Sequence, residues 1–137
     1  MILIDTHVLI WAVNNDQRLG RIARETIDAE TDAGTLYVSA ITPWEISLLV
    51  NKGRLSFGRD AGEWILDALD MPGVMLAPIE PMIAVNSVTL PGQFHPDPAD
   101  RFIVATARHH RWPLLTADRA ILVYGDAGHV EVMDAAL

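Results

Sequence analysis

The sequence of 137 residues contains no cysteine and a single lysine, Lys52. Without cysteine the chain can form no disulfide, no thiolate zinc site and no cysteine nucleophile. No apolar run approaches the ~20 residues that a membrane span requires, and the N-terminal MILIDTH has neither the basic flank nor the cleavage site of a signal peptide. These absences are typical of a cytoplasmic protein without a membrane partner.

Basic residues are also scarce, with 10 lysines and arginines against 18 acidic residues and a formal net charge of −8. An acidic chain is not a typical general nucleic-acid binder, because the nucleic-acid backbone is itself negatively charged. Any polyanion would have to approach through metal ions or a local basic patch. An apolar content of 50% is enough to bury a core, and the length predicts a single domain over residues 1–137.

Short apolar runs alternate with longer helical patterns along the chain. The predicted strands are residues 1–4, 36–40, 74–79, 113–116 and 130–133. The predicted helices are residues 7–13, 18–33, 42–50, 60–70, a short segment from Pro81, 98–110 and 118–123. Unbroken apolar strands separated by helices predict an α/β fold, with a parallel sheet covered on both faces. Ligands of such sheets bind beyond the carboxyl ends of the strands.

Five acidic residues follow predicted strands or begin predicted helices: Asp5, Glu45, Asp97, Asp100 and Asp118. The carboxyl ends of parallel strands share one edge of a sheet, so these distant segments are predicted to meet there. Carboxylates at close range repel one another and raise one another's pKa values. Bound cations would relieve this repulsion, and oxygen ligands suit Mg²⁺ or Mn²⁺ better than zinc.

Helix capping is the alternative explanation for all of these acids except Asp5. The segment Thr42–Glu45 matches a capping box with proline at N1, in which Glu45 accepts a hydrogen bond from a backbone N–H. Asp97 and Asp118 each match the N-cap of the helix that follows. Asp5 instead ends an apolar strand, where burying an unpaired carboxylate costs on the order of several kcal/mol. The joint placement of the five acids favours a metal site.

The histidines and arginines give weaker indications. The five histidines lack the paired spacing of zinc ligands, so none is assigned to a metal. Arg101 and Arg108 lie seven residues apart on the predicted helix 98–110, about 20° from eclipsed. Together with Arg111 they could form a basic stripe beside the acids. An ordinary solvent-exposed helix face is the alternative.

Four segments, in this order along the chain, resemble PIN-domain ribonucleases. They are DTHVLIW at 5–11, TPWEI at 42–46 with GRL at 53–55, HPDPADRFIVATA at 95–107 and LTAD at 115–118. The likeness is greatest to VapC, the toxin of VapBC toxin–antitoxin pairs, and extends to about Tyr124. It implies a three-layer α/β/α sandwich with a central parallel sheet. It also implies an endoribonuclease toxin that hydrolyses RNA phosphodiester bonds with Mg²⁺, or with Mn²⁺, and leaves a 5′-phosphate and a 3′-hydroxyl.

The resemblance carries over to individual residues. The acids that match the catalytic quartet are Asp5, Glu45, Asp100 and Asp118. The implied metal ligands are Asp5, Asp97, Asp100 and Asp118, and Glu45 would hold a second ion or orient the attacking water. Thr6 and Thr116 match hydroxyl neighbours that hold the acids in place. Arg101 and Arg108 are the candidate RNA contacts.

The resemblance also implies partners. These are a VapB-type antitoxin whose C-terminal segment crosses the acidic cleft, an RNA substrate of the tRNA or rRNA class, and a second copy of the chain in a homodimer. The sequence departs from the family at one position, because many members carry a lysine near the position of Leu49, whereas the lysine here is Lys52.

Three other functions can be compared with this one. A catalytically silent PIN-like binding protein differs little in sequence, although the acidic set is intact. A phospho-acceptor receiver domain needs a lysine near the end of its last strands, and Lys52 lies mid-chain. A haloacid-dehalogenase-like phosphatase needs two aspartates around one residue after its first strand, which Asp5-Thr6-His7 does not provide.

Overall fold

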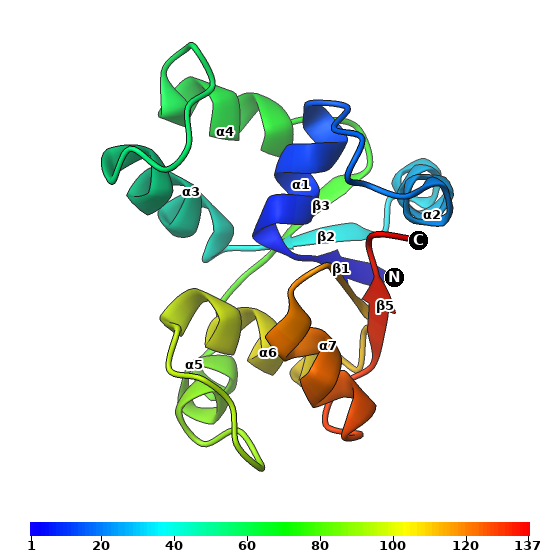
Figure 1. The fold of residues 1–137 in the computed structure, drawn as a ribbon, viewed down its shortest axis with the longest axis vertical. Helices are drawn as coiled ribbons and strands as arrows, with labels where there is room; N and C mark the ends of the chain where they lie inside the picture. The colour runs from blue at the N-terminus through cyan, green and yellow to red at the C-terminus, as the bar shows by residue number, and fades with distance from the viewer.

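A five-stranded sheet forms the centre of the computed structural model, which describes residues 1–137 (Figure 1). Its strands are β1 (Ile2–Ile4), β2 (Leu36–Ser39), β3 (Val74–Ala77), β4 (Leu114–Thr116) and β5 (Val132–Asp134). They lie in the order β3-β2-β1-β4-β5, and every neighbouring pair is parallel. The predicted parallel α/β fold is therefore confirmed.

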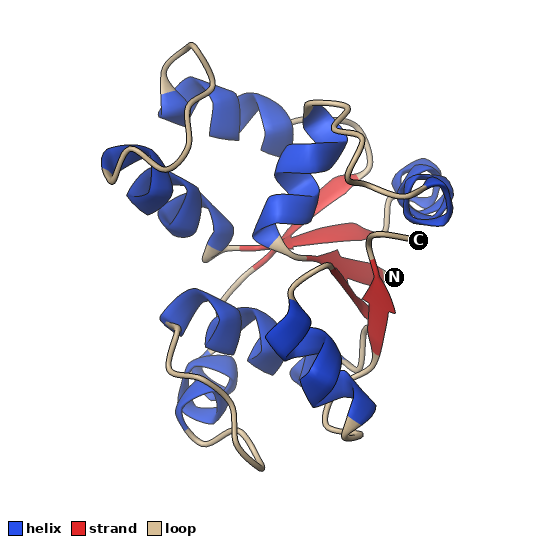
Figure 2. Cartoon of the chain, in the orientation of Figure 1, coloured by secondary structure: helices blue, strands red, loops and turns tan.

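Seven helices cover the two faces of this sheet (Figure 2). One face carries α1 (Thr6–Val13), α2 (Arg21–Ala33), α3 (Thr42–Asn51) and α4 (Ala61–Leu69). The other face carries α5 (Pro81–Val88), α6 (Pro98–His110) and α7 (Arg119–Asp126). The result is the three-layer α/β/α sandwich. None of the helices combines the length and the apolar character needed to cross a membrane.

Strand β1 contributes to two separate apolar cores. Successive side chains of a strand point to opposite faces, so Ile2 and Ile4 enter the core beneath α1–α4, and Leu3 enters the core beneath α5–α7. All three side chains are buried. Burial of such a side chain contributes about 1.5–3 kcal/mol, which explains why this strand is apolar at every position.

The two ends of the chain meet beside α2 (Figure 1). The Gly20 N–H donates to the Ala135 carbonyl and the Ala23 N–H donates to the Leu137 carbonyl, both at 2.9 Å. A Cβ atom at Gly20 would lie 2.1 Å from the Leu137 carbonyl oxygen, so a side chain cannot be placed there without moving the backbone. The close approach of the C-terminal residues therefore requires glycine.

Several predicted boundaries differ from the observed ones. The helix expected from Arg18 begins at Arg21, because the Asp16 carboxylate accepts the Arg18 backbone N–H and holds that residue in a turn. The strand expected over residues 74–79 ends at Ala77, and the last strand lies at 132–134 rather than 130–133. The final helix continues past the expected Val123 to Asp126.

The fold brings one end of several elements to a common edge. The carboxyl ends of β1, β2 and β4 lie side by side in the parallel sheet. Helices α1, α3 and α7 begin two or three residues after these strands. Their first turns consequently face the same region, which is the edge where parallel sheets bind ligands.

Candidate functional site

Acidic side chains from separate segments converge at the carboxyl edge of the sheet. Carboxylate oxygens of Asp5, Glu45 and Asp100 lie within 4.8 Å of one another. Asp100 also forms a group with His95 and Asp118, whose ligand atoms lie within the same limit. The predicted meeting of these distant residues at one edge of the sheet is therefore present in the structure.

Asp5 is the most deeply buried acid, with 2% of its surface exposed. It is the N-cap of α1, where its Oδ1 accepts the Thr6 N–H at 2.8 Å. Its Oδ2 accepts the Thr116 hydroxyl at 2.6 Å. Burial nevertheless raises the pKa of Asp5, and the nearby Asp118 carboxylate raises it further, while His7 and these hydrogen bonds act in the opposite direction. Asp5 is thus rigidly held in an environment that disfavours its negative charge.

Glu45 lies in the first turn of α3, but it does not cap that helix. The N-cap position is Ile41, which makes no side-chain hydrogen bond, so the predicted capping box was wrong. The Thr42 hydroxyl instead pairs with the Thr6 hydroxyl at 3.0 Å, which ties α3 to α1. Glu45 Oε1 is buried and has no hydrogen-bond partner. An unpaired buried carboxylate oxygen costs free energy, so this atom is available to a ligand.

Burial and like charges raise the pKa values of two further members of the cluster. Burial raises the pKa of Glu45 and the carboxylates of Asp5, Asp97 and Asp118 add to the effect, while the neighbouring Thr6 hydroxyl acts in the opposite direction. Burial, followed by the neighbouring acids with Asp5 first, raises the pKa of Asp100 to about 8. A bound cation would remove the cause of the electrostatic part of these shifts.

Asp97 and Asp118 serve as helix caps, and Asp118 also belongs to the acidic cluster. Asp97 Oδ1 accepts the Asp100 N–H at 3.2 Å at the start of α6. Asp118 Oδ1 accepts the Ile121 N–H at 3.1 Å at the start of α7. The predicted N-caps are confirmed, but each cap uses a single oxygen. Capping and membership of the acidic cluster are therefore compatible at Asp118. Asp97 is exposed and lies outside the groups of oxygens within 4.8 Å, so its role as a metal ligand stays a prediction.

Two histidines that the sequence left unassigned lie at the cluster with their ring orientation fixed. The Ala117 N–H donates to His7 Nε2 at 3.2 Å, which leaves the Nδ1–H facing Asp5 Oδ2, 3.5 Å away. The Asp97 N–H donates to His95 Nδ1 at 3.3 Å, which leaves the Nε2–H facing Asp100 Oδ2, 3.2 Å away. A backbone donor on one ring nitrogen sets the tautomer of each ring. Because His7 and His95 are each two residues from a predicted site residue, Asp5 and Asp97, their position at the cluster could have been predicted from the sequence.

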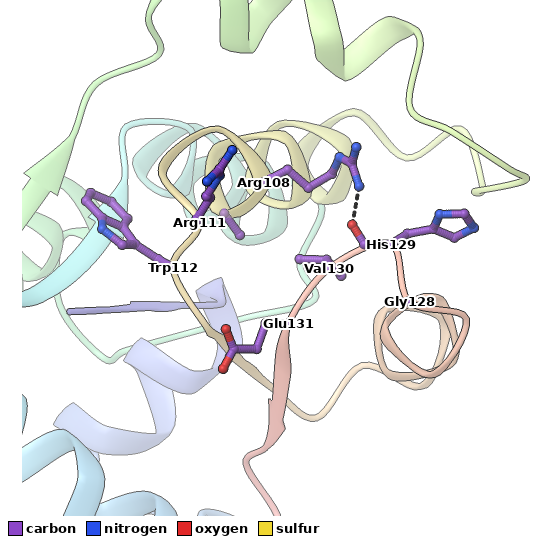
Figure 3. Close-up of a pocket in the computed structure, with 8 residues that line it drawn as sticks. Arg108, Arg111, Trp112, Gly128, His129, Val130 and Glu131 are labelled. Atoms are coloured by element: carbon purple, nitrogen blue, oxygen red, sulfur yellow. Dashed lines mark hydrogen bonds between the residues drawn. The ribbon is translucent and has the colours of Figure 1, made fainter.

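The predicted basic stripe beside the acids does not form. The Arg101 guanidinium donates to the backbone carbonyls of Ser87, Val88, Phe94 and His95, so it holds the segment that precedes α6. Arg108 donates to the His129 carbonyl, and with Arg111 it lines a pocket of about 460 Å³ before β4 and β5 (Figure 3). That pocket lies at the opposite edge of the sheet from the acids. Contact of Arg101 or Arg108 with RNA stays a prediction.

The sequence matches the family model for the PIN domain over residues 2–126. It is also 35% identical over 120 residues, which are 88% of each chain, to ribonuclease VapC22 of Mycobacterium tuberculosis. The chain belongs to the PIN-domain family. The resemblance inferred from four sequence segments is confirmed.

Solved structures share the architecture of this PIN domain. A chain of the VapBC2 complex from Rickettsia felis, solved with a promoter DNA fragment, aligns over 98% of both chains with a TM-score of 0.70 and 15% identity. A chain of FitAcB from Neisseria gonorrhoeae aligns over 97% of this chain and 96% of its own, with a TM-score of 0.59 and 25% identity. The three-layer arrangement of this PIN domain is therefore shared with chains of the VapBC2 and FitAcB structures.

Proposed function

We propose that this PIN domain is a divalent-metal-dependent endoribonuclease toxin. The observation that carries the proposal is the gathering of Asp5, Glu45 and Asp100 oxygens within 4.8 Å, one of which has no hydrogen-bond partner. The identity of 35% to a protein named ribonuclease VapC22 supports RNA as the substrate. The tRNA or rRNA class of substrate and a cytoplasmic location belong to the same proposal.

The residues present fit a hard divalent cation. Every carboxylate of the cluster offers oxygen, and oxygen ligands suit Mg²⁺ and Mn²⁺. Asp5, Asp97, Asp100 and Asp118 would hold the ion, directly or through water, and Glu45 would hold a second ion or a water. When bound, such an ion lowers the pKa of a water ligand and offsets the charge that develops on the phosphoryl group.

The chain's own residues prepare the site for hydrolysis. Thr116 and the Thr6 N–H fix both oxygens of Asp5, so this carboxylate needs no rearrangement when substrate arrives. Glu45 Oε1, which has no partner, would accept a proton from the water that attacks phosphorus. The attack forms the new phosphorus–oxygen bond and breaks the bond to the 3′ oxygen, which leaves as a hydroxyl after taking up a proton.

The charge of the cluster explains why this chemistry would depend on a cation. The five acids carry −5 of the formal charge of −8. A cluster of this sign repels the RNA backbone until cations neutralise it. We therefore expect RNA binding at the site, as well as cleavage, to require a divalent ion.

Incubation of the purified protein with mixed cellular RNA tests the proposal. Fragments are expected with Mg²⁺ and not with excess chelator, and end mapping is expected to give 5′-phosphates and 3′-hydroxyls. Asp5→Asn, purified in parallel, should fold normally by circular dichroism and lose cleavage. Fragments of equal amount from the variant would refute the assignment. Retention of RNA without fragments would favour the silent binding protein.

We also propose a VapB-type antitoxin and a second copy of the chain as partners. The fold is shared with chains of the VapBC2 and FitAcB complexes. Helix α5 exposes Met82, Val85 and Val88, which are apolar side chains available for an interface. Size-exclusion chromatography with light scattering, with and without the product of the neighbouring small reading frame, tests both associations. A monomer that binds no such product would refute both.

A further inference from the structure

A second cluster of metal-ligating side chains lies at the carboxyl end of α6. Ligand atoms of Glu80, His109 and His110 lie within 4.8 Å of one another. His109 Nε2 lies 3.0 Å from Glu80 Oε2, and His110 Nε2 lies 3.8 Å from the same oxygen. Because Glu80 is the N-cap residue of α5, the cluster joins the beginning of one helix to the end of another.

One atom of this cluster has an unmet bonding requirement. His110 Nε2 is buried and has no hydrogen-bond partner, and the only other buried side-chain atom in this condition is Glu45 Oε1 in the acidic cluster. Leaving a buried polar atom unpaired costs about 1–3 kcal/mol. The missing partner of His110 Nε2, which lies beside a carboxylate and a second imidazole, is explained if this nitrogen binds a metal ion.

Aromatic stacking holds the His110 ring in place. The ring stacks on Trp112 with centroids 4.0 Å apart and an interplanar angle of 16°. Trp112 stacks in turn on Tyr37 of β2 at 4.0 Å. His109 meets the His110 ring edge-on at 4.8 Å. The ligand ring is therefore anchored to the sheet before any ion binds, which reduces the entropic cost of binding.

We infer that Glu80, His109 and His110 form a binding site for a divalent transition-metal ion of the zinc class. Two imidazoles and one carboxylate are the ligands that zinc sites use, and a fourth position remains for water. Tetrahedral bonds of about 2.0–2.1 Å place ligand atoms roughly 3.3 Å apart, close to the observed 3.0 and 3.8 Å. The negative end of the α6 dipole also favours a cation there.

The inferred zinc site is separate from the acidic cluster. His109 lies nine positions after Asp100 on α6, a rise of about 14 Å along the helix. The ion would clamp α5 to α6 rather than take part in hydrolysis. This inference does not rest on the proposed nuclease function, and either could fail alone.

Zinc titration in a background without the acidic site tests the inference. In Asp5→Asn/Asp100→Asn, isothermal titration calorimetry is expected to detect one Zn²⁺ per chain, and Co²⁺ is expected to give the visible absorption bands of tetrahedral coordination. Adding His109→Gln and His110→Gln should weaken Zn²⁺ binding at least tenfold and abolish the bands. The matched control His129→Gln, which removes a histidine outside the cluster, should leave both unchanged.

Circular dichroism and thermal unfolding in chelator establish that each variant is folded to the same extent. Addition of Zn²⁺ should raise the unfolding temperature of the background protein and of the His129→Gln control, but not that of the double-histidine variant. Unchanged Zn²⁺ affinity after the two histidine substitutions would overturn the inference. So would the absence of Zn²⁺ uptake by the background protein, which would leave Glu80 and His109 as an ordinary ion pair.

Discussion

The two ends of α6 carry candidate cation sites built in opposite ways. The amino end contributes Asp100 to a cluster rich in carboxylates, whereas the carboxyl end contributes His109 and His110 to a cluster with one carboxylate. Each cluster contains one of the two buried side-chain atoms without a hydrogen-bond partner. The balance of ligands differs, since the first cluster is mostly carboxylate oxygen, which suits Mg²⁺ or Mn²⁺, and the second is mostly imidazole, which suits zinc.

The two clusters also differ in how the fold assembles them. The acidic cluster forms because parallel strands deliver their carboxyl ends to one edge of the sheet. The histidine cluster forms because α5 and α6 pack together, which brings Glu80 to two residues far along the chain. The order and direction of the strands determine which residues meet at the sheet edge. The packing of individual side chains determines which residues meet between the two helices.

The largest expected difference between the two clusters is the effect of their substitution on RNA cleavage. Asp100→Asn should lower Mg²⁺-dependent RNA cleavage at least 100-fold, about 2.7 kcal/mol of transition-state stabilisation, because it removes a partly buried carboxylate from the acidic cluster. His109→Gln with His110→Gln should leave cleavage within about threefold of the unsubstituted protein in Mg²⁺. Equal losses at the two ends would contradict the separation of the clusters.

The stability of the metal-free protein should depend on pH through the amino end of α6. The pKa of Asp100 is about 8 in the folded chain, against an ordinary value of 3.8. The unfolded chain therefore loses this proton first, and the free energy of unfolding should fall as pH rises from about 4 to about 8, by on the order of 2–4 kcal/mol.

Urea unfolding in chelator at several pH values measures this dependence. Asp100→Asn should flatten the slope, whereas His109→Gln with His110→Gln should retain most of it. A slope that is equally steep in Asp100→Asn would show that other groups cause the pH dependence.

Arg101→Lys should distinguish a structural role of this side chain from contact with RNA. The Arg101 guanidinium donates to four backbone carbonyls before α6, and a lysine ammonium cannot reproduce this planar set of donors. We expect a loss of about 2 kcal/mol in the free energy of unfolding and faster proteolysis near residues 89–95. Weaker RNA binding with unchanged stability would instead favour direct contact with RNA.

Thr116→Val should produce the smallest effect of the series. The Thr116 hydroxyl donates to Asp5 Oδ2 at 2.6 Å and accepts the Asp118 N–H at 3.0 Å. Valine removes both bonds. Loss of the one to the charged Asp5 carboxylate, worth about 1.5 kcal/mol, corresponds to roughly tenfold slower cleavage, and the unpaired Asp118 N–H lowers stability. Thr116→Ser should restore the rate, because it retains the hydroxyl. Failure of serine to do so would assign the effect to packing.

Much of the fold and of the acidic cluster could be predicted from the sequence. The apolar run before Asp5 and the Asp97-Pro98 start of α6 are local signals, because strand burial and helix capping depend on neighbouring residues. The parallel topology then places these residues at one edge. The free Oε1 of Glu45 could not be predicted, because its capping-box pattern is broken by a pairing of Thr42 with Thr6 across two helices.

The contacts of the histidines were the part of both clusters that the sequence indicated least. Spacing rules search for ligands a few residues apart, whereas the partner of His109 and His110 is Glu80 in another element. His7 and His95 likewise depend on backbone donors at Ala117 and Asp97 to fix their rings. Such contacts depend on packing and loop geometry, which have no periodic signal in the chain.

Mn²⁺ titration calorimetry tests the acidic cluster most directly. The His109→Gln/His110→Gln protein serves as the reference, so that the second cluster cannot supply a high-affinity site. At pH 7 we expect it to take up at least one Mn²⁺, and we expect Asp5→Asn and Asp100→Asn, added together, to weaken that binding at least tenfold. Equal Mn²⁺ affinity with and without the two carboxylates, or no uptake by the reference protein, would contradict a metal site at this edge of the sheet.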